Sequence, residues 1–365
     1  MYIKKLTLKN YRNYSCEEFN FINGINILTG DNAQGKTNCA EAIFFLCTGY
    51  SPRASKDRQV IKYGENSGVI SGVCQSLFGD IKIDIDFSLK KSKEIKVNGV
   101  KASKIGELMG NMNSVFFNPE DLKLIKESPE DRRRFMDISI SQMSRRYFYA
   151  LQKYRKILEQ RNNLLKNPDR EVIFETLPLW DEQLSEYAEI IIKERRNFVD
   201  KLIPYAKKAH QFITDGKETF DISFETSFDV DGGDIKKSLL YELTSRYEKD
   251  IIIGHTSVGP HRDDLKIKVN GEDVRIYGSQ GQQRTSAITL KLAELEIFNE
   301  RFKEYPILIL DDALSELDKS RRNKLIERLN GIQTIITCTE LTDDLKEILN
   351  VNHIKIENGN IKRVE

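Results

Sequence analysis

The residues best suited to chemistry form a glycine-rich loop near the start of the chain. The pattern G-x-x-x-x-G-K-[ST] is met, directly after an apolar run at residues 25–28, by Gly30, Asp31, Asn32, Ala33, Gln34, Gly35, Lys36 and Thr37. Glycines let successive backbone N–H groups curl around phosphate oxygens, and the N-terminus of the following helix adds favourable partial charge. Lys36 would reach the β- and γ-phosphates, and the Thr37 hydroxyl would bind Mg²⁺. The sequence therefore predicts an ATP site.

Two carboxylates end an apolar run late in the chain. Residues 307–310 are all Ile or Leu and lead into Asp311 and Asp312. A buried parallel strand with acids at its carboxyl end is where a P-loop fold holds its magnesium ion. Asp311 is the expected metal-side acid, and Asp312 is the expected base for the attacking water. Alone, the pattern also fits an ordinary strand that runs into an acidic turn, but the phosphate loop favours the catalytic interpretation.

A loop rich in glycine and glutamine precedes a clear helix at residues 285–300. Ser279, Gly281 and Gln282 lie in this loop, and Ser315-Glu316-Leu317-Asp318 follows the two acids. Together these segments resemble the signature loop and the D-loop of ABC-type ATPases. In that class the signature loop of one protomer contacts the γ-phosphate held by the other, because N–H groups at a helix N-terminus complete an anion site. The resemblance implies an ATP-dependent homodimer.

The elements that must position these loops fall into three blocks. Strand-like alternation marks residues 1–8 and 81–87, and Asn-Gly turns stand at residues 98–99 and 270–271. Residues 121–249 are mainly helical, and we expect Pro168 and Pro178 to divide this block into two or three helices. Residues 1–120 and 250–365 carry complementary halves of one site. We therefore expect an α/β fold, in which an ABC-type P-loop ATPase head, split in sequence, carries an inserted α-helical arm at residues 121–249.

Composition limits the class of protein. Of the 365 residues, 39% are hydrophobic and 31% are charged, which is typical of a globular chain. No run approaches the ~18 apolar residues of a membrane span, and the start lacks the apolar core of a signal peptide. The five cysteines are scattered, with no C-x-x-C pair. This favours reduced thiols in a cytoplasmic protein over a disulfide framework or a zinc site.

Charge is unevenly distributed along the chain. The net charge of +1 indicates nothing about nucleic acid, but residues 121–170 carry 13 Lys or Arg against 7 Asp or Glu, an excess of +6. Arg132, Arg133, Arg145 and Arg146 contribute to this excess. A solvated helical surface and a phosphate-binding face explain it equally well. No base-reading module is recognisable, so DNA binding through this segment would be independent of sequence.

Longer blocks accompany the phosphate loop in a fixed order. Asn38 and Glu41-Ala42-Ile43 follow the loop, and further along the chain residues 115–122 read VFFNPEDL, residues 129–137 read PEDRRRFMD and residues 255–264 read HTSVGPHRDD. In type and order these blocks resemble the RecF family along nearly the whole chain. The resemblance implies a recombinational repair protein that binds DNA when ATP is bound, dimerises with ATP and has weak ATPase activity. It also implies that the protein works with RecR and RecO to help RecA load at single-strand gaps bordered by duplex.

The chain departs from the usual ABC pattern at three positions. Asp312 stands where Glu is usual, no Gln lies at residues 117–122, and no His follows residues 335–337. Asn118 or Glu120 is expected to replace the Gln, and Thr337 or Thr339 the His. A carboxylate one methylene shorter than usual favours slow hydrolysis.

Three arginine-bearing segments gain an interpretation from the resemblance. Arg12-Asn13 and Ser51-Pro52-Arg53 occupy positions that the family places beside the nucleotide, and the alternative for each arginine is an ordinary surface position. His261-Arg262 is expected at the head surface or on a DNA-facing side.

Two other functions compete with an ATP-gated DNA clamp. One is the ATPase subunit of a membrane transporter, which the cationic helical insertion disfavours, and the other is a nucleotide-gated scaffold that does not hydrolyse ATP.

Overall fold

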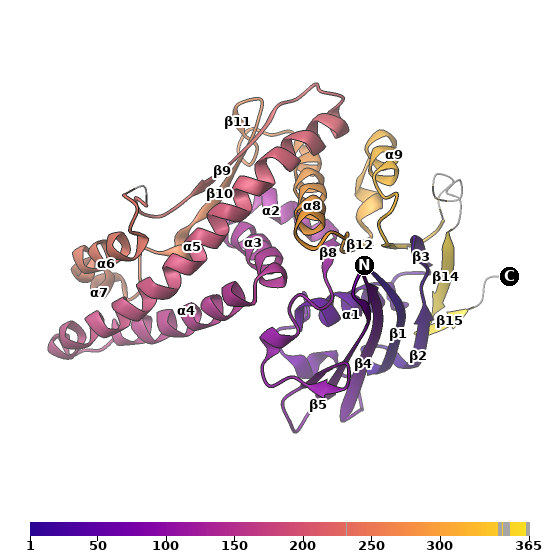
Figure 1. Cartoon of the computed structure of the whole chain (residues 1–365), viewed down its shortest axis with the longest axis horizontal. Helices are drawn as coiled ribbons and strands as arrows, with labels where there is room; N and C mark the ends of the chain where they lie inside the picture. The colour runs from indigo at the N-terminus through magenta and orange to yellow at the C-terminus, as the bar shows by residue number, and fades with distance from the viewer. Residues whose placement is uncertain (231, 342–344, 346–350, 363–365) are drawn as a thin grey trace. The chain divides into compact units, whose positions relative to one another are not determined.

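The structure is a computed structural model that describes residues 1–230, 232–341, 345 and 351–362 (Figure 1). Its internal contacts divide the chain into two units. The first unit comprises Met1–Leu122, Lys208–Lys217 and Arg284–Glu365, and the second comprises Lys123–Lys207 and Glu218–Gln283. The second unit thus contains residues 250–283, which the sequence pattern assigned to the head.

An antiparallel sheet forms one layer of the first unit. Its strand order is β2-β1-β4-β5-β6-β7. The strands are β1 (Tyr2–Tyr11), β2 (Tyr14–Asn20), β4 (Ser67–Ser76), β5 (Gly79–Ser88), β6 (Glu94–Val97) and β7 (Val100–Lys101). Alternation along β1 and β5 places Leu6, Leu8, Ile83 and Ile85 in the core, as their period of two predicts. The turn between β6 and β7 is the expected Asn-Gly turn, with φ of 51° at Asn98 and 80° at Gly99.

A mainly parallel sheet forms the other layer. Its order is β15-β14-β3-β13-β12-β8, and only the β14–β15 pair is antiparallel. The strands are β3 (Ile25–Thr29), β8 (Ser114–Phe117), β12 (Ile307–Asp311), β13 (Thr334–Cys338), β14 (Asn352–Glu357) and β15 (Asn360–Lys362). Only β13 separates β3 from β12. The loop after β3 and the acids after β12 therefore emerge at the same edge of the sheet.

Helix α1 (Lys36–Thr48) packs between the two sheets, against β8, β12 and β13 on one side and β4 and β5 on the other. Nearly all of its side chains are buried, because it has a layer on each side. Among its described residues, the first unit also contains α9 (Lys319–Glu327), the end of α5 (Arg170–Thr214) and the short turns η1 (Asp57–Val60), η2 (Ile105–Glu107), η3 (Pro119–Leu122) and η5 (Ala313–Glu316). Helix α8 (Gln280–Phe302) begins in the second unit and continues in the first.

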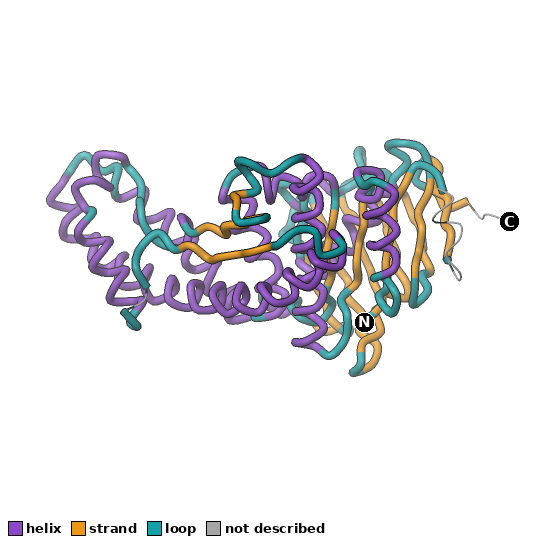
Figure 2. Tube along the Cα trace, turned by 90° about the horizontal axis from the view of Figure 1, so that it is seen from above, coloured by secondary structure: helices purple, strands orange, loops and turns teal. Residues whose placement is uncertain are grey.

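The second unit is mainly helical (Figure 2). Its helices are α2 (Lys123–Lys126), α3 (Pro129–Met143), α4 (Arg145–Leu164), most of α5 (Arg170–Thr214), α6 (Ile235–Ser245), α7 (Tyr247–Ile253) and the turn η4 (Pro260–Arg262). It also contains a three-stranded sheet in the order β11-β10-β9, made of β9 (Phe220–Glu225), β10 (Asp264–Val269) and β11 (Glu272–Asp273). The expected helical arm is thus accompanied by a small sheet.

One expected helix break is wrong. Pro168 does lie in the connection between α4 and α5, but Pro178 lies inside α5. An internal proline costs about 3 kcal/mol because it removes one hydrogen bond and crowds the preceding turn. Here the apolar face runs past it without interruption, since Leu177, Leu184 and Ala188 are fully buried. Burial of that face outweighs the local cost, and the helix continues.

Candidate nucleotide site

The phosphate loop joins β3 to α1 in a backbone shape that requires glycine at two places. Gly30 has φ of +149°, and a Cβ there would lie 2.3 Å from the carbonyl oxygen of Ile356. Gly35 has φ of +123°, and a Cβ there would lie 2.7 Å from the hydroxyl of Tyr14. Real side chains do not reach such distances, so both glycines are needed for the loop to curl.

The start of α1 is suited to an anion. Its N-cap is Gly35, which has no side chain to cap the first N–H groups, and its first turn carries no acid. The amino group of Lys36 donates to the carbonyl oxygens of Gly30 at 2.7 Å and Asp31 at 2.9 Å, so the ammonium group lies within the loop. Uncapped N–H groups and a positive charge at one helix start are the features that bind phosphate.

Side chains from outside hold the loop in place. Asn13 Nδ2 donates to the carbonyl of Gln34 at 2.7 Å, and the Tyr14 hydroxyl donates to the carbonyl of Gly35 at 2.9 Å. On the other side, the backbone N–H of Gly359 donates to the carbonyl of Gln34 at 3.0 Å. The turns β1–β2 and β14–β15 therefore both bind the carbonyl of Gln34.

One of the two acids, Asp311, contacts the first turn of the helix that follows the phosphate loop. Asp311 Oδ1 accepts hydrogen bonds from Thr37 Oγ1 at 3.0 Å and from Thr337 Oγ1 at 2.7 Å. Burial raises the pKa of Asp311, although the two hydroxyl hydrogen bonds oppose the rise. Asp312 has a left-handed backbone, with φ of 52°, and its N–H donates to Thr337 Oγ1 at 3.0 Å. Thr337 therefore positions both acids.

These groups fit Mg²⁺ bound together with a nucleotide. Within the described parts of the chain, no group of three or more His, Cys, Asp or Glu side chains could hold a metal ion. Thr37 and Asp311 offer one hydroxyl and one carboxylate, and Asp311 is only 6% exposed. Magnesium takes its remaining ligands from phosphates and water when a protein offers one or two carboxylates. The donor set suits that arrangement better than a metal site without a nucleotide.

The two arginines expected beside the nucleotide form ion pairs with one buried glutamate. Glu41 is fully buried on α1 and accepts from Arg12 at 3.0 and 2.7 Å, from Arg53 at 2.8 Å and from the Ser51 hydroxyl. Burial alone would raise the pKa of Glu41, but the hydrogen bonds from Arg12 and Ser51 and the charge of Arg53 outweigh it and lower the pKa. Arg53 also donates to Asn38 Oδ1 at 2.7 Å. The two segments thus meet at the first turns of α1.

The role of Glu41 was not recognised from the sequence, although a signal is present. A carboxylate stands within the apolar run from Cys39 to Leu46, on a helix that has layers on both sides. Buried charges are paired, so such a residue predicts cationic partners. The sequence does not reveal which arginines these are, because the partners come from two separate loops.

The signature loop lies in the second unit and is already folded. Ser279 Oγ accepts from the N–H of Gln282 at 3.2 Å, and Gln282 Oε1 accepts from the N–H of Ser279 at 3.0 Å. This reciprocal pair is a capping box at the start of α8. Gln282 Nε2 also donates to Glu218 at 3.0 Å, and Ser279 itself is exposed. The loop around Gly281 therefore presents a fixed surface.

The expected substitutes for the Gln-loop and the switch histidine remain predictions. Asn118 and Asp121 close a turn on each other, with side chain to backbone distances of 2.8 and 3.1 Å. Asp121 also lies 3.3 Å from the amino group of Lys291. The hydroxyl of Thr337, one of the two expected substitutes for the histidine, already bonds to the carboxylate of Asp311 and to the N–H of Asp312.

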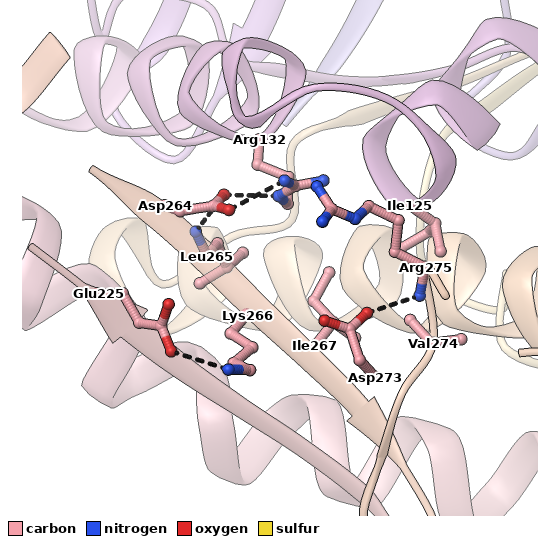
Figure 3. Close-up of a pocket in the computed structure, with 10 residues that line it drawn as sticks. All are labelled: Ile125, Arg132, Glu225, Asp264, Leu265, Lys266, Ile267, Asp273, Val274 and Arg275. Atoms are coloured by element: carbon pink, nitrogen blue, oxygen red, sulfur yellow. Dashed lines mark hydrogen bonds and ion pairs between the residues drawn. The ribbon is translucent and has the colours of Figure 1, made fainter. Parts of the chain in front are cut away.

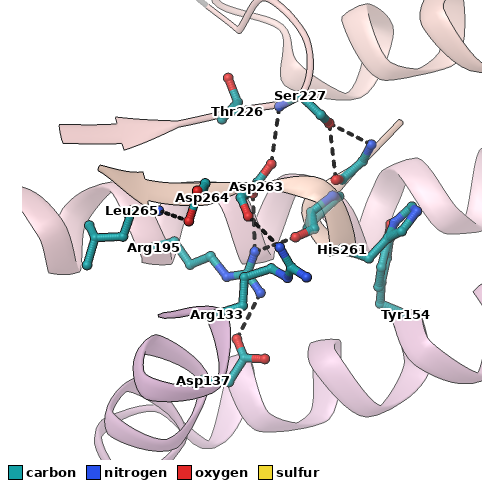
Figure 4. Close-up of polar contacts among 12 residues, drawn as sticks. Arg133, Asp137, Tyr154, Arg195, Thr226, Ser227, His261, Asp263, Asp264 and Leu265 are labelled. Carbon is teal, nitrogen blue, oxygen red and sulfur yellow. Dashed lines mark hydrogen bonds and ion pairs between the residues drawn. The ribbon is translucent and has the colours of Figure 1, made fainter. Parts of the chain in front are cut away.

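The four arginines suggested for DNA contact fall into two pairs. Arg132 is 3% exposed and forms a two-pronged ion pair with Asp264, at 2.6 and 3.0 Å, beside a cleft of about 150 Å³ (Figure 3). Arg133 donates to the carbonyl of Asp263 at 2.8 Å (Figure 4). Arg145 and Arg146 are exposed at the start of α4. Arg145 and Arg146 are therefore accessible to solvent, whereas the guanidinium of Arg132 is buried in its ion pair with Asp264.

His261 and Asp263 contact other side chains of the second unit. The ring nitrogens of His261 lie 2.6 Å from the Tyr154 hydroxyl and 3.0 Å from the carbonyl of Thr256, and burial lowers its pKa to about 4 (Figure 4). Asp263 pairs with Arg195 at 3.2 Å, and burial raises its pKa to about 6. His261 therefore joins η4 to α4 and does not lie on a head surface. Arg262 is exposed.

Comparison with known proteins identifies the family. A family model described as "RecF/RecN/SMC N terminal domain" matches residues 2–359. Two curated relatives are both called "DNA replication and repair protein RecF". One, from Ruminiclostridium cellulolyticum, is 42% identical over 99% of each chain, and the other, from Clostridium acetobutylicum, is 45% identical over 99% of each chain. The chain belongs to the RecF family.

Solved structures agree with this assignment. A structure of "the recombination mediator protein RecF-ATPrS in RecFOR pathway" superimposes with a TM-score of 0.91 at 36% identity, covering 100% of this chain and 98% of that one. The corresponding RecF-ATP structure gives 0.89 at the same identity and coverage. An Smc head domain from Pyrococcus furiosus gives 0.58 at 18% identity over 100% of this chain and 96% of that one, which shows the fold alone. The expected ABC-like ATPase head is thus confirmed for this RecF-family chain. Among the described residues, no helix is both long and apolar enough to cross a membrane.

Proposed function

We propose that this RecF-family chain is an ATP-gated DNA-binding protein of recombinational repair. ATP joins two copies on DNA near single-strand gaps, where the dimer helps RecA load together with RecR and RecO and hydrolyses ATP slowly. The observation that carries this proposal is the contact between Thr37 and Asp311 at the mouth of the phosphate loop. The relatives named for DNA replication and repair, and the neighbours solved with ATP in the RecFOR pathway, support it.

Different residues at the phosphate loop bind the phosphates, the cation and the attacking water. The N–H groups at the start of α1 and the ammonium group of Lys36 hold the β- and γ-phosphates. Thr37 and Asp311 are the residues that would hold Mg²⁺, which stabilises charge on the phosphates as a Lewis acid. Asp312 orients the attacking water. Its backbone is fixed by Thr337, and its side chain is short, which supports slow hydrolysis.

The signature loop supplies the dimer contact. Ser279 is exposed at the N-terminus of α8, where the helix dipole favours an anion. Because its capping box fixes the loop before any ligand arrives, little conformational entropy is lost on meeting the γ-phosphate held by a second copy. Gly281 lies in the first turn and belongs to the same contact, whereas the N–H of Gln282 is bound by Ser279 Oγ, so Gln282 fixes the shape of the loop.

One face of α4 is the proposed DNA contact. Its exposed side carries Arg145, Arg146, Lys153 and Lys156, and its opposite side is buried, with Tyr147, Leu151, Tyr154 and Ile157 in the core. Cationic side chains spaced along one helix face suit a phosphate backbone and carry no base specificity. Arg132 is not part of this proposal, because its guanidinium is bound to Asp264.

The nucleotide site is tested by measuring ATP and DNA binding of wild type and Lys36→Ala, with Lys91→Ala as an exposed control in the same unit. We expect Lys36→Ala to lose ATP binding and the ATP-dependent part of DNA binding, and Lys91→Ala to keep both. Equal behaviour of all three proteins would contradict the proposal. Phosphate release from wild type compared with Lys36→Ala separates slow hydrolysis from a scaffold that does not hydrolyse ATP.

A further inference from the structure

A glutamate outside the motifs described above contacts the signature loop. Glu218 lies in the connection between α5 and β9, and its Oε1 accepts a hydrogen bond from Gln282 Nε2 at 3.0 Å, across 64 positions of the sequence. The residues before it form an ordinary helix end, since Gly216 has φ of +71° and its N–H donates to the carbonyl of Gln211 at 2.9 Å. The contact with Gln282 is what distinguishes Glu218 from other half-buried acids.

The amide of Gln282 is bound at both ends. Its oxygen accepts from the N–H of Ser279 at 3.0 Å, and its nitrogen donates to Glu218. A carboxylate only accepts hydrogen bonds, whereas an amide has one accepting end and one donating end. Glu218 therefore binds the donating end of Gln282 and leaves the oxygen for Ser279. Without Glu218 the amide is free to turn over, and the N–H of Ser279 would then face another donor.

The base of the signature loop has contacts of its own. The carbonyl of Val274, which is buried, accepts from the N–H of Gly278 at 3.1 Å and from Gln283 Nε2 at 3.3 Å. A Cβ at Gly278 would lie 2.4 Å from that carbonyl oxygen, so the turn closes only with glycine. The segment before Ser279 is therefore fixed from below, and the capping box at Ser279 is the part of the loop that depends on Glu218.

The charge of Glu218 and its geometry act in opposite directions on a phosphate. Like charges repel, so the carboxylate would weaken binding of a γ-phosphate at this loop if it acted through its charge alone. A formed capping box instead favours binding, because it keeps the helix N-terminus in one shape with its dipole directed at the ligand. The two effects can therefore be separated by the sign of the change that a substitution causes.

We propose that Glu218 is a positioning residue of the signature loop, which orients the amide of Gln282 so that Ser279 is held toward the γ-phosphate bound by a second copy of the chain. The proposal rests on the proposed ATP-dependent dimer. Glu218 does not touch the nucleotide in this account and lies in a different unit from Lys36, so ATP binding to a single chain does not depend on it.

The size of the effect follows from the kind of bond and from symmetry. Loss of a hydrogen bond to a charged group weakens an equilibrium by about ten-fold or more. A two-fold symmetric dimer contains each contact twice. Removal of the Glu218 carboxylate should therefore weaken the dimer by about 100-fold.

The first experiment measures the dissociation constant of the dimer in ATP and Mg²⁺ by analytical ultracentrifugation, and the ATP affinity of the monomer at high dilution. Glu218→Ala should weaken the dimer by about 100-fold and leave the ATP affinity of the monomer unchanged. Glu218→Gln keeps an accepting oxygen and should dimerise like wild type. Glu272→Ala removes an exposed acid from β11 of the same small sheet and should also dimerise like wild type. A wild-type dimer in Glu218→Ala would overturn the proposal, and so would an equal loss in Glu218→Gln.

A charge-reversing variant separates orientation from charge. Glu218→Lys offers only donors, so it should turn the amide of Gln282 and weaken the dimer at least as much as Glu218→Ala does. Its positive charge alone would attract a phosphate and strengthen the dimer. A dimer tighter than that of wild type would show that position 218 acts through its charge, which would overturn the proposal.

A readout without nucleotide tests whether the loop itself depends on Glu218. Amide hydrogen exchange across residues 275–285 should be faster in Glu218→Ala than in wild type and Glu218→Gln, because the N–H of Ser279 loses its acceptor. Unchanged exchange in Glu218→Ala would overturn the proposal. The proposed function fails separately. If wild type stays monomeric with ATP, the sandwiched dimer is wrong, while hydrogen exchange still decides whether Glu218 orders the signature loop.

Discussion

The hydroxyl of Thr37 lies 3.0 Å from Asp311 Oδ1, although the two residues are 274 positions apart in the sequence. The first turn of α1 and the end of β12 are brought together because β3, β13 and β12 are neighbours in one parallel sheet. This contact marks the place where a cation and the phosphates would be held.

Replacing Asp311 by Asn should abolish most hydrolysis while keeping the hydrogen bonds of its neighbours. The amide still accepts from Thr37 and Thr337 but brings no negative charge to a cation. We expect ATP hydrolysis to fall by about 10²-fold or more, since removal of one preorganised electrostatic partner costs that much. Phosphate release at saturating Mg-ATP measures it. Asp80→Asn, which changes an exposed partner of Lys4, is the control, and a wild-type rate for Asp311→Asn would contradict the assignment.

Replacing Arg161 by Met should destabilise the second unit. Arg161 is fully buried, lies 2.6 Å from Asp181 and 2.9 Å from Asp250, and donates to Thr256 Oγ1. Its loss leaves two buried carboxylates without their cation, which costs about 3–5 kcal/mol of unfolding free energy.

The measurement for Arg161→Met is urea unfolding followed by the fluorescence of Trp180, which lies in the second unit. Arg170→Met is the matched control, because Arg170 pairs with Glu248 on the surface. An exposed pair contributes about 0–1 kcal/mol. Equal stability of the two variants would show that the buried triad does not hold α4, α5 and α7 together.

The free energy of unfolding below pH 6.5 should depend on His261. Burial lowers its pKa from 6.5 to about 4, so the folded chain keeps the ring neutral where the unfolded chain takes up a proton. The contribution of His261 is complete above pH 6.5 and is lost as pH falls toward 4, by up to about 3 kcal/mol. Asp263 has the opposite effect on the free energy of unfolding. Burial raises its pKa to about 6, so the folded chain binds a proton at Asp263 before the unfolded chain does, and this contribution grows as pH falls.

Comparing wild type with His261→Gln separates the two groups. The variant retains Asp263 but has no group that titrates at position 261. Its disadvantage relative to wild type should therefore shrink as pH falls from 6.5 to 4. Urea unfolding at several pH values, followed through Trp180, gives the difference. If the two stability profiles are parallel, His261 does not titrate in this window.

DNA affinity should fall when charges on the exposed face of α4 are removed. We expect the double variant Arg146→Ala with Lys153→Ala to bind duplex DNA more weakly at every sequence. The slope of log K against log salt should decrease in magnitude by about 1.8, since each phosphate contact contributes about 0.9. Fluorescence anisotropy at several salt concentrations measures this. A double variant at two exposed lysines of the first unit, Lys90→Ala with Lys91→Ala, is the control, and an unchanged slope for the α4 variant would contradict the proposed contact.

The sequence is informative where chemistry requires particular residues at fixed spacing. The phosphate loop allows only glycine at positions 30 and 35, and the apolar strand before Asp311 must be buried. Both could be recognised without a structure, and so could the Asn-Gly turns. The ATPase head fold follows from the order of these blocks.

The sequence is less informative where several elements compete for one residue. Pro178 is a helix breaker by local preference, but a continuous buried face keeps α5 intact. Arg132 and Arg145 look alike in a cationic stretch, yet one lies against Asp264 and the other faces solvent. The small sheet of the second unit forms between β9 and β10, whose paired residues lie between Asp264↔Glu225 and Val269↔Phe220, far apart in the sequence. Local patterns do not encode such partners.

The measurement that tests the central claim most directly is the mass of the protein in solution. It is determined without nucleotide, with ATP and Mg²⁺, and with ATP and Mg²⁺ for Ser279→Arg, which places a bulky side chain on the signature loop far in sequence from Lys36. ATP should convert the wild-type monomer into a dimer, and Ser279→Arg should remain monomeric while still binding ATP. If wild type stays monomeric with ATP, or if Ser279→Arg dimerises equally well, the ATP-sandwiched dimer is contradicted.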